Sequence, residues 1–394
     1  MKALYTWIEE KAQSGMDAAT LSGRLTMLGM EVEECRHQGG VIPGLEVGEV
    51  LTCEDHPNSD HLHVCRVRVQ GQETTIVCGA ENVRAGIKVV VATVGTRLPG
   101  DFVIKKAKIR GVESLGMICS KEELGLEEKS KGIWILSGCT PPGPAGENLL
   151  GNEDWIMSLA ITSNRSDCLS INGLAREAAV AAGKRFTPAL SAVSENPGIA
   201  APAVTIEASE LCGRYAARLV RGVKIGPSPE WMVRRLESCG MRSINNIVDV
   251  TNYVLLEYGH PLHAFDLAKL EGGQIVVRRA REGERLVTLD GQERLLDPTM
   301  LVIADAVRPV ALAGVMGGAN SEVSDGTVDI LLESAWFDPV SVRRTSKKTG
   351  LSTEASYRFE RTADFGACTG ALDRAVELIL ETAGGKPGPL TDAI

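Results

Sequence analysis

The stretch 242–266 constrains the fold of this chain more than any other. Its apolar residues recur at helical spacing, and Gly259 followed by Pro261 ends the helix. Valine and threonine lose rotamer freedom in helices, so tertiary packing must hold this one. We predict an amphipathic helix with one buried face, with Asn252 and the histidines of the next turn reaching beyond its end. The polar side chains of the stretch are Arg242, Asn245, Asn246, Asp249, Thr251, Asn252, His260, His263 and Asp266.

Three later segments belong with this stretch. They read Ala-Gly-Val-Met-Gly-Gly at 313–318, Leu-Glu-Ser-Ala-Trp-Phe-Asp-Pro at 332–339 and Gly-Leu-Ser-Thr-Glu-Ala-Ser-Tyr-Arg-Phe-Glu-Arg at 350–361. In this order, the four blocks together resemble the editing module of the β subunit of bacterial phenylalanyl-tRNA synthetases. The resemblance implies that the module hydrolyses wrongly charged aminoacyl-tRNA.

Composition limits the other possibilities. A chain of 394 residues with 44% hydrophobic and 4% aromatic residues is typical of a soluble globular protein of two to four domains. Its net charge of -9 argues against general nucleic-acid binding, so any RNA contact requires a local basic strip. Ten cysteines without a Cys-x-x-Cys pair indicate reduced thiols and a cytoplasmic location.

Neither targeting nor membrane insertion is indicated. The first eleven residues include Glu9 and Glu10 where a signal peptide requires an apolar run. No apolar stretch approaches the roughly 20 residues that span a bilayer. We expect no membrane partner.

The N-terminal part is predicted to fold with a distant segment. Asp17 begins a short helix with an apolar stripe, but this unit is too small to fold alone. The family resemblance implies a small discontinuous α/β domain formed by 1–39 and 152–190. Ser163 and Ser166 depart from it, because the family commonly has proline there.

The insertion 40–151 reads as short strands separated by glycine, proline and asparagine, which favours a small closed β-barrel. Its segments 56–60, 77–83 and 105–117 resemble the tRNA-binding OB-fold of this subunit and of related tRNA-binding proteins. His61 departs from the pattern, since lysine is common there and would supply a fixed charge.

A basic run marks the candidate tRNA contact of the barrel. A purely structural interpretation is a strand edge protected by lysines, whereas the OB-fold resemblance favours phosphate contact. The predicted tRNA-binding residues are Lys105, Lys106, Lys108, Arg110, Arg84 and Asn82.

The barrel also carries the one set of residues that suggests a metal. Only His56 and His61 approach the spacing of zinc ligands, and buried cysteines are common as small apolar residues. We therefore expect no metal site. The set comprises Cys53, His56, His61, His63, Cys65 and Cys78.

The remainder alternates strands with capped helices, as in a mixed α+β domain. We predict a linker at 191–210 because proline, serine and glycine are frequent around it, and an editing domain at 211–386. The whole chain is thus a multidomain α+β protein with an inserted OB-fold barrel.

The chemistry expected of the editing domain needs no covalent nucleophile. No nucleophile elbow, phosphate-binding loop or dinucleotide fingerprint is present. Because an aminoacyl ester is labile, a positioned water and backbone donors near Gly314, Gly317 and Gly318 can suffice. The alternative is that these glycines only form turns and that His263 is an ordinary core histidine.

Glu333 is the sharpest single candidate, because apolar residues surround it in the sequence. One interpretation is a structural ion pair with Arg343 or Arg358. The resemblance implies instead that Glu333 binds the phenolic hydroxyl of tyrosine, by which a second site rejects tyrosine from phenylalanine tRNA. By resemblance, the catalytic residues are His263, Asn252, Thr251, Gly317 and Gly318, and the substrate-binding residues are Arg242, Glu333, Thr353, Ala355 and Gly314.

The family's β subunit is about twice as long as this chain. The resemblance implies that the synthetic site, ATP and magnesium, and most contacts with the α subunit of the heterotetramer belong to the missing part. We expect tRNA(Phe) binding and proofreading here, but no cofactor. Two alternatives remain open: a freestanding tRNA-binding regulator without catalysis, and a freestanding editing hydrolase.

Overall fold

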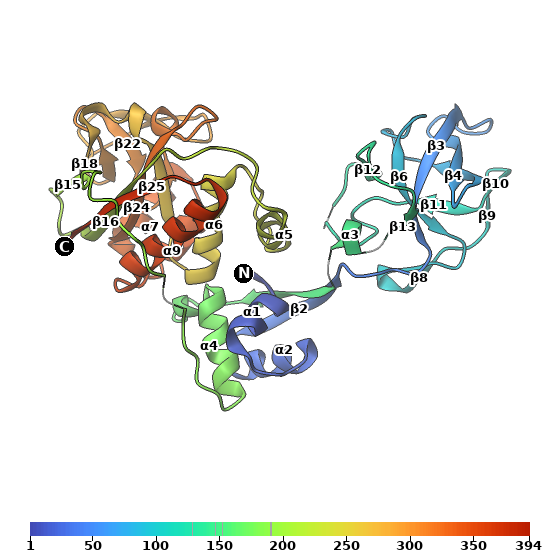
Figure 1. Cartoon of the computed structure of the whole chain (residues 1–394), viewed down its shortest axis with the longest axis horizontal. Helices are drawn as coiled ribbons and strands as arrows, with labels where there is room; N and C mark the ends of the chain where they lie inside the picture. Colours follow the sequence, from blue (N-terminus) through green and yellow to red (C-terminus); the bar gives the residue numbers. More distant parts are fainter. Residues whose placement is uncertain (128, 146, 152, 190) are drawn as a thin grey trace. The chain divides into compact units, whose positions relative to one another are not determined.

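A computed structural model describes residues 1–127, 129–145, 147–151, 153–189 and 191–394, without the side chains of 147 and 148. It divides into two compact units (Figure 1). The larger unit comprises Met1–Cys35 and Met157–Ile394, and the barrel unit comprises Arg36–Ile156. Together they make a mixed α+β protein of several domains, as predicted.

The barrel unit is built around one sheet that nearly closes on itself. Its main strands are β3 (Leu45–Asp55), β4 (His63–Val69), β5 (Gln72–Cys78), β6 (Lys88–Thr93) and β11 (Gly116–Ile118), in the order β11-β6-β3-β4-β5, with β12 (Ile135–Leu136) on β6 and β13 (Gly143–Pro144) on β3. The amide of Leu115 donates to the carbonyl of Thr75 at 2.9 Å, which ties the two edges together. Buried and exposed residues alternate along β4, whereas β6 is buried throughout its middle, and both patterns were visible in the sequence.

Smaller elements complete this unit: β7 (Arg97–Leu98), β8 (Phe102–Val103), β9 (Ala107–Ile109), β10 (Val112–Ser114) and the short helix α3 (Glu147–Leu150). Strands β9 and β10 form an antiparallel hairpin in which Ile109 faces Val112. Its two turn residues, Arg110 and Gly111, both have positive φ, at 45° and 99°. That is the geometry of a two-residue hairpin loop, and it presents Arg110 at an exposed tip.

The larger unit begins with the helical segment predicted from the N-terminus. Its elements are β1 (Lys2–Leu4), α1 (Tyr5–Ala12), α2 (Ala18–Met27), β2 (Glu31–Gln38), β14 (Asp154–Ala160) and α4 (Ile171–Ala181). The strands pair in the order β1-β14-β2, and α1 and α2 both pack on α4. Asp17 caps α2 by accepting a hydrogen bond from the amide of Thr20. The segments that precede and follow the barrel in the sequence therefore fold together.

The rest of the larger unit is a two-sheet module, residues 195–393. One sheet has the order β17-β24-β16-β25 and the other β15-β18-β21-β22-β23. Apolar residues from both sheets form one core between them. The strands are β15 (Ala203–Ile206), β16 (Cys212–Arg221), β17 (Leu262–Asp266), β18 (Gln274–Arg279), β21 (Leu301–Ala304), β22 (Pro309–Leu312), β23 (Met316–Gly317), β24 (Asp329–Phe337) and β25 (Lys386–Ala393), with a separate pair β19 (Arg285–Val287) and β20 (Glu293–Leu295).

Helices complete the module: α5 (Glu230–Ser238), α6 (Asn246–Tyr258), α7 (Pro339–Thr349), α8 (Glu354–Phe359) and α9 (Ala367–Thr382). Helices α6 and α9 lie beside each other and against the four-stranded sheet (Figure 1). Asn245 caps α6. Gly259 ends the helix, as predicted, with φ of 71°. Asp249 holds the start of α6 by accepting from the hydroxyls of Ser228 and Ser243. No helix in the described ranges is long and apolar enough to cross a bilayer.

Three sequence predictions are wrong in this module. The linker at 191–210 contains β15, which pairs in parallel with β18, and Ile199 is buried in the core. The domain does not end at residue 386, because β25 pairs with β16 as far as Ala393. Asn252 lies inside α6 and does not reach beyond its end. Frequent proline and glycine indicate irregular backbone, which is compatible with tight packing.

Candidate functional site

Strand register brings two predicted site residues together. In the antiparallel pair of β17 and β24, His263 lies directly opposite Glu333. Such partners project from the same face of a sheet. That face is the inner one, because Phe265 and Leu331, two positions further along, belong to the core between the sheets. The two residues therefore share the space between the sheets.

Glu333 is 6% exposed, and its partner is a tyrosine. The phenol of Tyr215 on β16 donates to Glu333 Oε2 at 2.8 Å, and Oε1 has no partner among the described residues. Burial raises the pKa of Glu333 to about 8, against the opposing hydrogen bond from Tyr215, so the carboxyl group is largely neutral near pH 7. The ion-pair interpretation is wrong: Arg358 bonds to Glu354 and to the carbonyl of Leu169, and Arg343 is exposed.

His263 packs against the glycine loop. A Cβ added at Gly317 would lie 2.6 Å from Cε1 and 2.8 Å from Nε2 of the imidazole. The Nε2 atom is buried and has no partner in the described part of the chain. Burial lowers the pKa of His263 to about 4, so the ring is neutral at pH 7. A satisfied core histidine is therefore a poor description, since buried ring nitrogens normally have partners.

The glycine loop 313–318 joins β22 to β23. Gly314 has φ of 68°, and a Cβ there would lie 2.9 Å from Val342, so this position needs glycine both for the turn and for close packing. The amide of Gly318 already donates to the carbonyl of Val310 at 2.8 Å. That amide is not available to a reacting oxyanion, which removes Gly318 from the predicted backbone donors.

Thr353 connects α8 to this loop. Its hydroxyl donates to the carbonyl of Val315 at 2.8 Å and accepts from the amide of Ser356 at 3.0 Å, as the cap of α8. Ala355, in the first turn of α8, packs against the core between the sheets. The glycine loop and α8 therefore behave as one wall beside His263.

Among the described residues, three predicted site residues make no hydrogen bond or ion pair to this cluster. Arg242 is exposed in the connection between α5 and α6. The hydroxyl of Thr251 donates to Val248 within α6, and Asn252 is half-buried on the same helix. The sequence reading missed Tyr215, which lies 118 residues from Glu333. The sequence of β16 does not alternate, since the strand is buried from Tyr215 to Val220, and no local pattern reveals its partner strand.

The predicted tRNA-binding strip lies on and beside the β9–β10 hairpin. Lys105, Lys106, Lys108 and Arg110 are exposed there, and Lys106 pairs with Glu113 at 2.8 Å. Lys105 also lines a cavity of about 500 Å³, together with the ring of Phe102, which is 59% exposed. The strip therefore combines cations with an accessible aromatic side chain, two features that single-stranded nucleic acids bind.

Arg84 and Asn82 differ from each other. Arg84 is exposed and has no ion pair among the described residues. The amide of Asn82 is engaged twice, donating to the carbonyl of Ile133 at 2.9 Å and accepting from its amide at 3.0 Å. Asn82 thus holds the barrel together, and its contact with tRNA stays a prediction.

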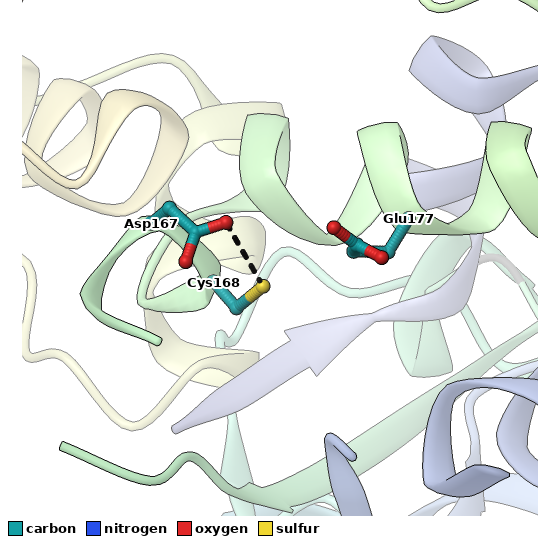
Figure 2. Close-up of side chains that lie close together, drawn as sticks. All are labelled: Asp167, Cys168 and Glu177. Carbon is teal, nitrogen blue, oxygen red and sulfur yellow. Dashed lines mark hydrogen bonds between the residues drawn. The ribbon is translucent and has the colours of Figure 1, made fainter. Parts of the chain in front are cut away.

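Among the described residues, the barrel histidines and cysteines that suggested a metal do not form a group that could hold one. His56 binds the carbonyl of Ile109 through Nε2, and Cys65 lies 3.8 Å from Cys53. In the described ranges, one group of metal-ligand type does converge, namely Asp167, Cys168 and Glu177 (Figure 2). The guanidinium of Arg165 lies among them, with Nη2 2.7 Å from Glu177 and 2.9 Å from the thiol. A cation of the protein already balances this group.

Known proteins match both units. The family model described as a B3/4 domain matches 211–384, and the one described as a putative tRNA binding domain matches 45–145. Similar curated proteins include phenylalanine–tRNA ligase beta subunits of Geobacter metallireducens, 54% identical over 98% of this chain, and Geobacter sulfurreducens, 52% identical over 98%. Each match covers 48% of the relative, so the chain spans about half their length.

A solved structure is also similar, an N-terminal fragment of the phenylalanyl-tRNA synthetase beta-subunit from Pyrococcus horikoshii. It is 14% identical, with a TM-score of 0.35, over 62% of this chain and 67% of that one, which is too weak to support a conclusion. The identity to the curated relatives and the two matched domains agree without it. The chain belongs to the family of phenylalanine–tRNA ligase beta subunits, of which it represents the N-terminal half.

Proposed function

We propose that this chain binds tRNA(Phe) through its barrel unit and hydrolyses tyrosyl-tRNA(Phe) in the two-sheet module. One observation carries the proposal: the buried carboxyl group of Glu333 already accepts a hydrogen bond from a phenol, that of Tyr215, at 2.8 Å. A site of this kind suits a tyrosyl side chain. It is a poor site for a phenylalanyl side chain, which offers no donor.

The selection follows from what each ligand leaves unpaired. Tyrosine and phenylalanine differ by one hydroxyl, and an apolar synthetic pocket rejects such an extra group only weakly. In the proposed site, a tyrosyl phenol pairs with Glu333 Oε1, whereas a phenylalanyl ring buries that oxygen without a hydrogen-bond partner. An unpaired buried polar group costs about 1–3 kcal/mol, which corresponds to a preference of about 5- to 150-fold for the tyrosyl ester.

His263 is the proposed catalytic side chain. With its pKa lowered to about 4 by burial, it is a weak base at pH 7, so we assign it to orientation of the water or the ester through Nε2. Gly317 lets the imidazole approach the loop, and Thr353 with Ala355 limits the size of the pocket. As family-based proposals, Thr251 and Asn252 keep their catalytic assignment and Arg242 keeps its substrate-binding assignment.

The basic strip of the barrel supplies the proposed tRNA contact. Each cation that neutralises a phosphate releases bound counterions, so a few exposed lysines add measurable affinity despite the net charge of -9. Lys105, Lys108, Arg110 and Arg84 are the favoured contacts, since Lys106 already has an acidic partner. We place the protein in the cytoplasm, where tRNA charging occurs.

The complete synthetase is proposed to pair this subunit with an α subunit in a heterotetramer and to use ATP and magnesium. The described residues do not fit magnesium, because the one converging group includes a thiol and is balanced by Arg165. No step of the proposed hydrolysis is routed through a metal. Synthesis of the ester is assigned to domains outside this chain.

The test is deacylation of preformed tyrosyl-tRNA(Phe) and phenylalanyl-tRNA(Phe), by this chain alone and by the assembled synthetase that contains it. We expect preferential cleavage of the tyrosyl ester by the synthetase, and loss of the preference in Glu333→Ala. Equal rates on both esters would refute the proposal. Full activity of the chain alone would favour a freestanding editing enzyme, and tRNA binding without hydrolysis in either sample would favour a regulator.

A further inference from the structure

The inner face of β16 contributes a residue that the proposed function does not yet use. Tyr215 is fully buried, and its phenol hydrogen-bonds to Glu333 on the neighbouring strand β24. In the register of the sheet, Glu333 lies opposite His263 on one side and opposite Ala217 on the other, and Tyr215 is two positions from Ala217 on the same face. Tyr215 and His263 therefore flank the carboxyl group from opposite sides.

We propose that Tyr215 is a positioning residue that sets substrate selectivity, because its phenol occupies Glu333 Oε2 and leaves Oε1 free to form a hydrogen bond with a tyrosyl hydroxyl. This inference rests on the proposed editing function and adds a residue to it. It gives the two carboxyl oxygens different tasks: Oε2 holds the side chain in place, and Oε1 binds the ligand.

The surroundings of Glu333 explain why such a holder is needed. A glutamate side chain has three rotatable bonds, and neither neighbour in the register holds it by a hydrogen bond. Ala217 is apolar, and the Nε2 atom of His263 makes no hydrogen bond to the carboxyl group or to any other described residue. Without the phenol, the carboxyl group is free to turn, and Oε2 becomes an unpaired buried acceptor. A ligand must then compete with alternative orientations of the group it binds.

The titratable groups around Glu333 are few. They are Tyr215 and Cys212 on β16 and His263 on β17. The opposite sheet contributes Met316 and Gly317 from β23, and α8 packs Ala355 and Phe359 toward the core. Burial raises the pKa of Glu333 and the hydrogen bond from Tyr215 lowers it, so removal of the phenol moves this pKa further upward.

The decisive variant is Tyr215→Phe in the assembled synthetase, because it deletes one hydroxyl and keeps the ring. We expect a folded enzyme whose tyrosyl-to-phenylalanyl deacylation ratio falls about 3- to 10-fold, the worth of one hydrogen bond. The pH at which selectivity is lost should move upward. A merely structural tyrosine would not shift that pH profile. Tyr5→Phe is the matched control, since its phenol donates at 2.8 Å to the carbonyl of Met16.

An unchanged ratio and pH profile in Tyr215→Phe would overturn the proposal. A ratio that rises would overturn it as well, because the phenol would then be a competitor of the substrate. If the wild-type synthetase cleaves neither ester, the proposed function fails, and the Tyr215 assignment is decided by a direct measurement. NMR titration of the Glu333 carboxyl carbon in the chain should then show a higher pKa in Tyr215→Phe, and an equal pKa in both proteins would refute the assignment.

Discussion

Gly317→Ala tests whether the close approach of His263 to the glycine loop matters for hydrolysis. The added Cβ would lie 2.6 Å from Cε1 of the imidazole and 3.1 Å from Leu289 Cδ1. Carbon atoms in contact normally lie about 3.5–4.0 Å apart, so the ring must retreat by roughly 1 Å. Gly317 has no positive φ, which means that alanine strains the contact and not the backbone.

The expected effects on activity and stability differ in size. Overpacking of a core contact typically costs about 1–3 kcal/mol, and the exposed end of Leu289 relieves part of it. Displacement of a catalytic group by about 1 Å costs roughly 100-fold in rate. We therefore expect Gly317→Ala to remain folded and to deacylate tyrosyl-tRNA(Phe) about 100-fold more slowly.

The assay is single-turnover deacylation by the assembled synthetase, with urea unfolding of each variant measured in parallel. Gly326→Ala is the control, because no atom lies within 4 Å of the added Cβ and φ is not positive there. It should behave as wild type in both measurements. A folded Gly317→Ala enzyme that cleaves at the wild-type rate would show that the position of His263 is irrelevant to catalysis.

Three further predictions concern charge. Replacing Lys105, Lys106 and Lys108 together by alanine should weaken tRNA binding and reduce the slope of log affinity against log salt by about 2, which filter binding measures. Burial raises the pKa of Glu333 to about 8, so its contribution to stability is present below about pH 4.5 and is lost as pH rises through 8. Between pH 5 and pH 9, the unfolding free energy of Glu333→Gln in urea should therefore rise relative to that of the wild type by up to about 5 kcal/mol. His260 is buried against Phe359 with its pKa lowered to about 4, so stability should fall by up to about 3 kcal/mol as pH drops from 6.5 to 4, and His260→Leu should flatten that decline.

Local signals predicted much of the fold. The alternation of β4, the apolar run of β6 and the cap Asp17 depend on residues within a few positions of each other, and the structure has each where the pattern placed it. The prediction of a linker at 191–210 failed for the opposite reason. Ile199 and β15 are held by strands more than 60 residues away, which no local composition reveals.

In the candidate site, too, residues with local sequence signals were predicted and residues that depend on distant strands were not. Glu333 and His263 were identified from flanking residues and family blocks, and the register of β17 with β24 makes them neighbours. Tyr215 escaped because its role depends on a hydrogen bond between distant strands. The structural role of Asn82 also escaped, because a sequence does not show whether a side-chain amide is already engaged.

One physical cause, burial between two sheets, sets the charge state of both central residues. It raises the pKa of Glu333 to about 8 and lowers that of His263 to about 4. Proton transfer from the acid to the imidazole would therefore run uphill by about four pKa units, or about 5 kcal/mol, so the two do not form an ion pair. An ion pair would satisfy both groups and leave a closed structural core. As neutral neighbours, each keeps an unshared polar atom, Oε1 of Glu333 and Nε2 of His263, and the site selects its ligand by hydrogen bonding instead of by charge.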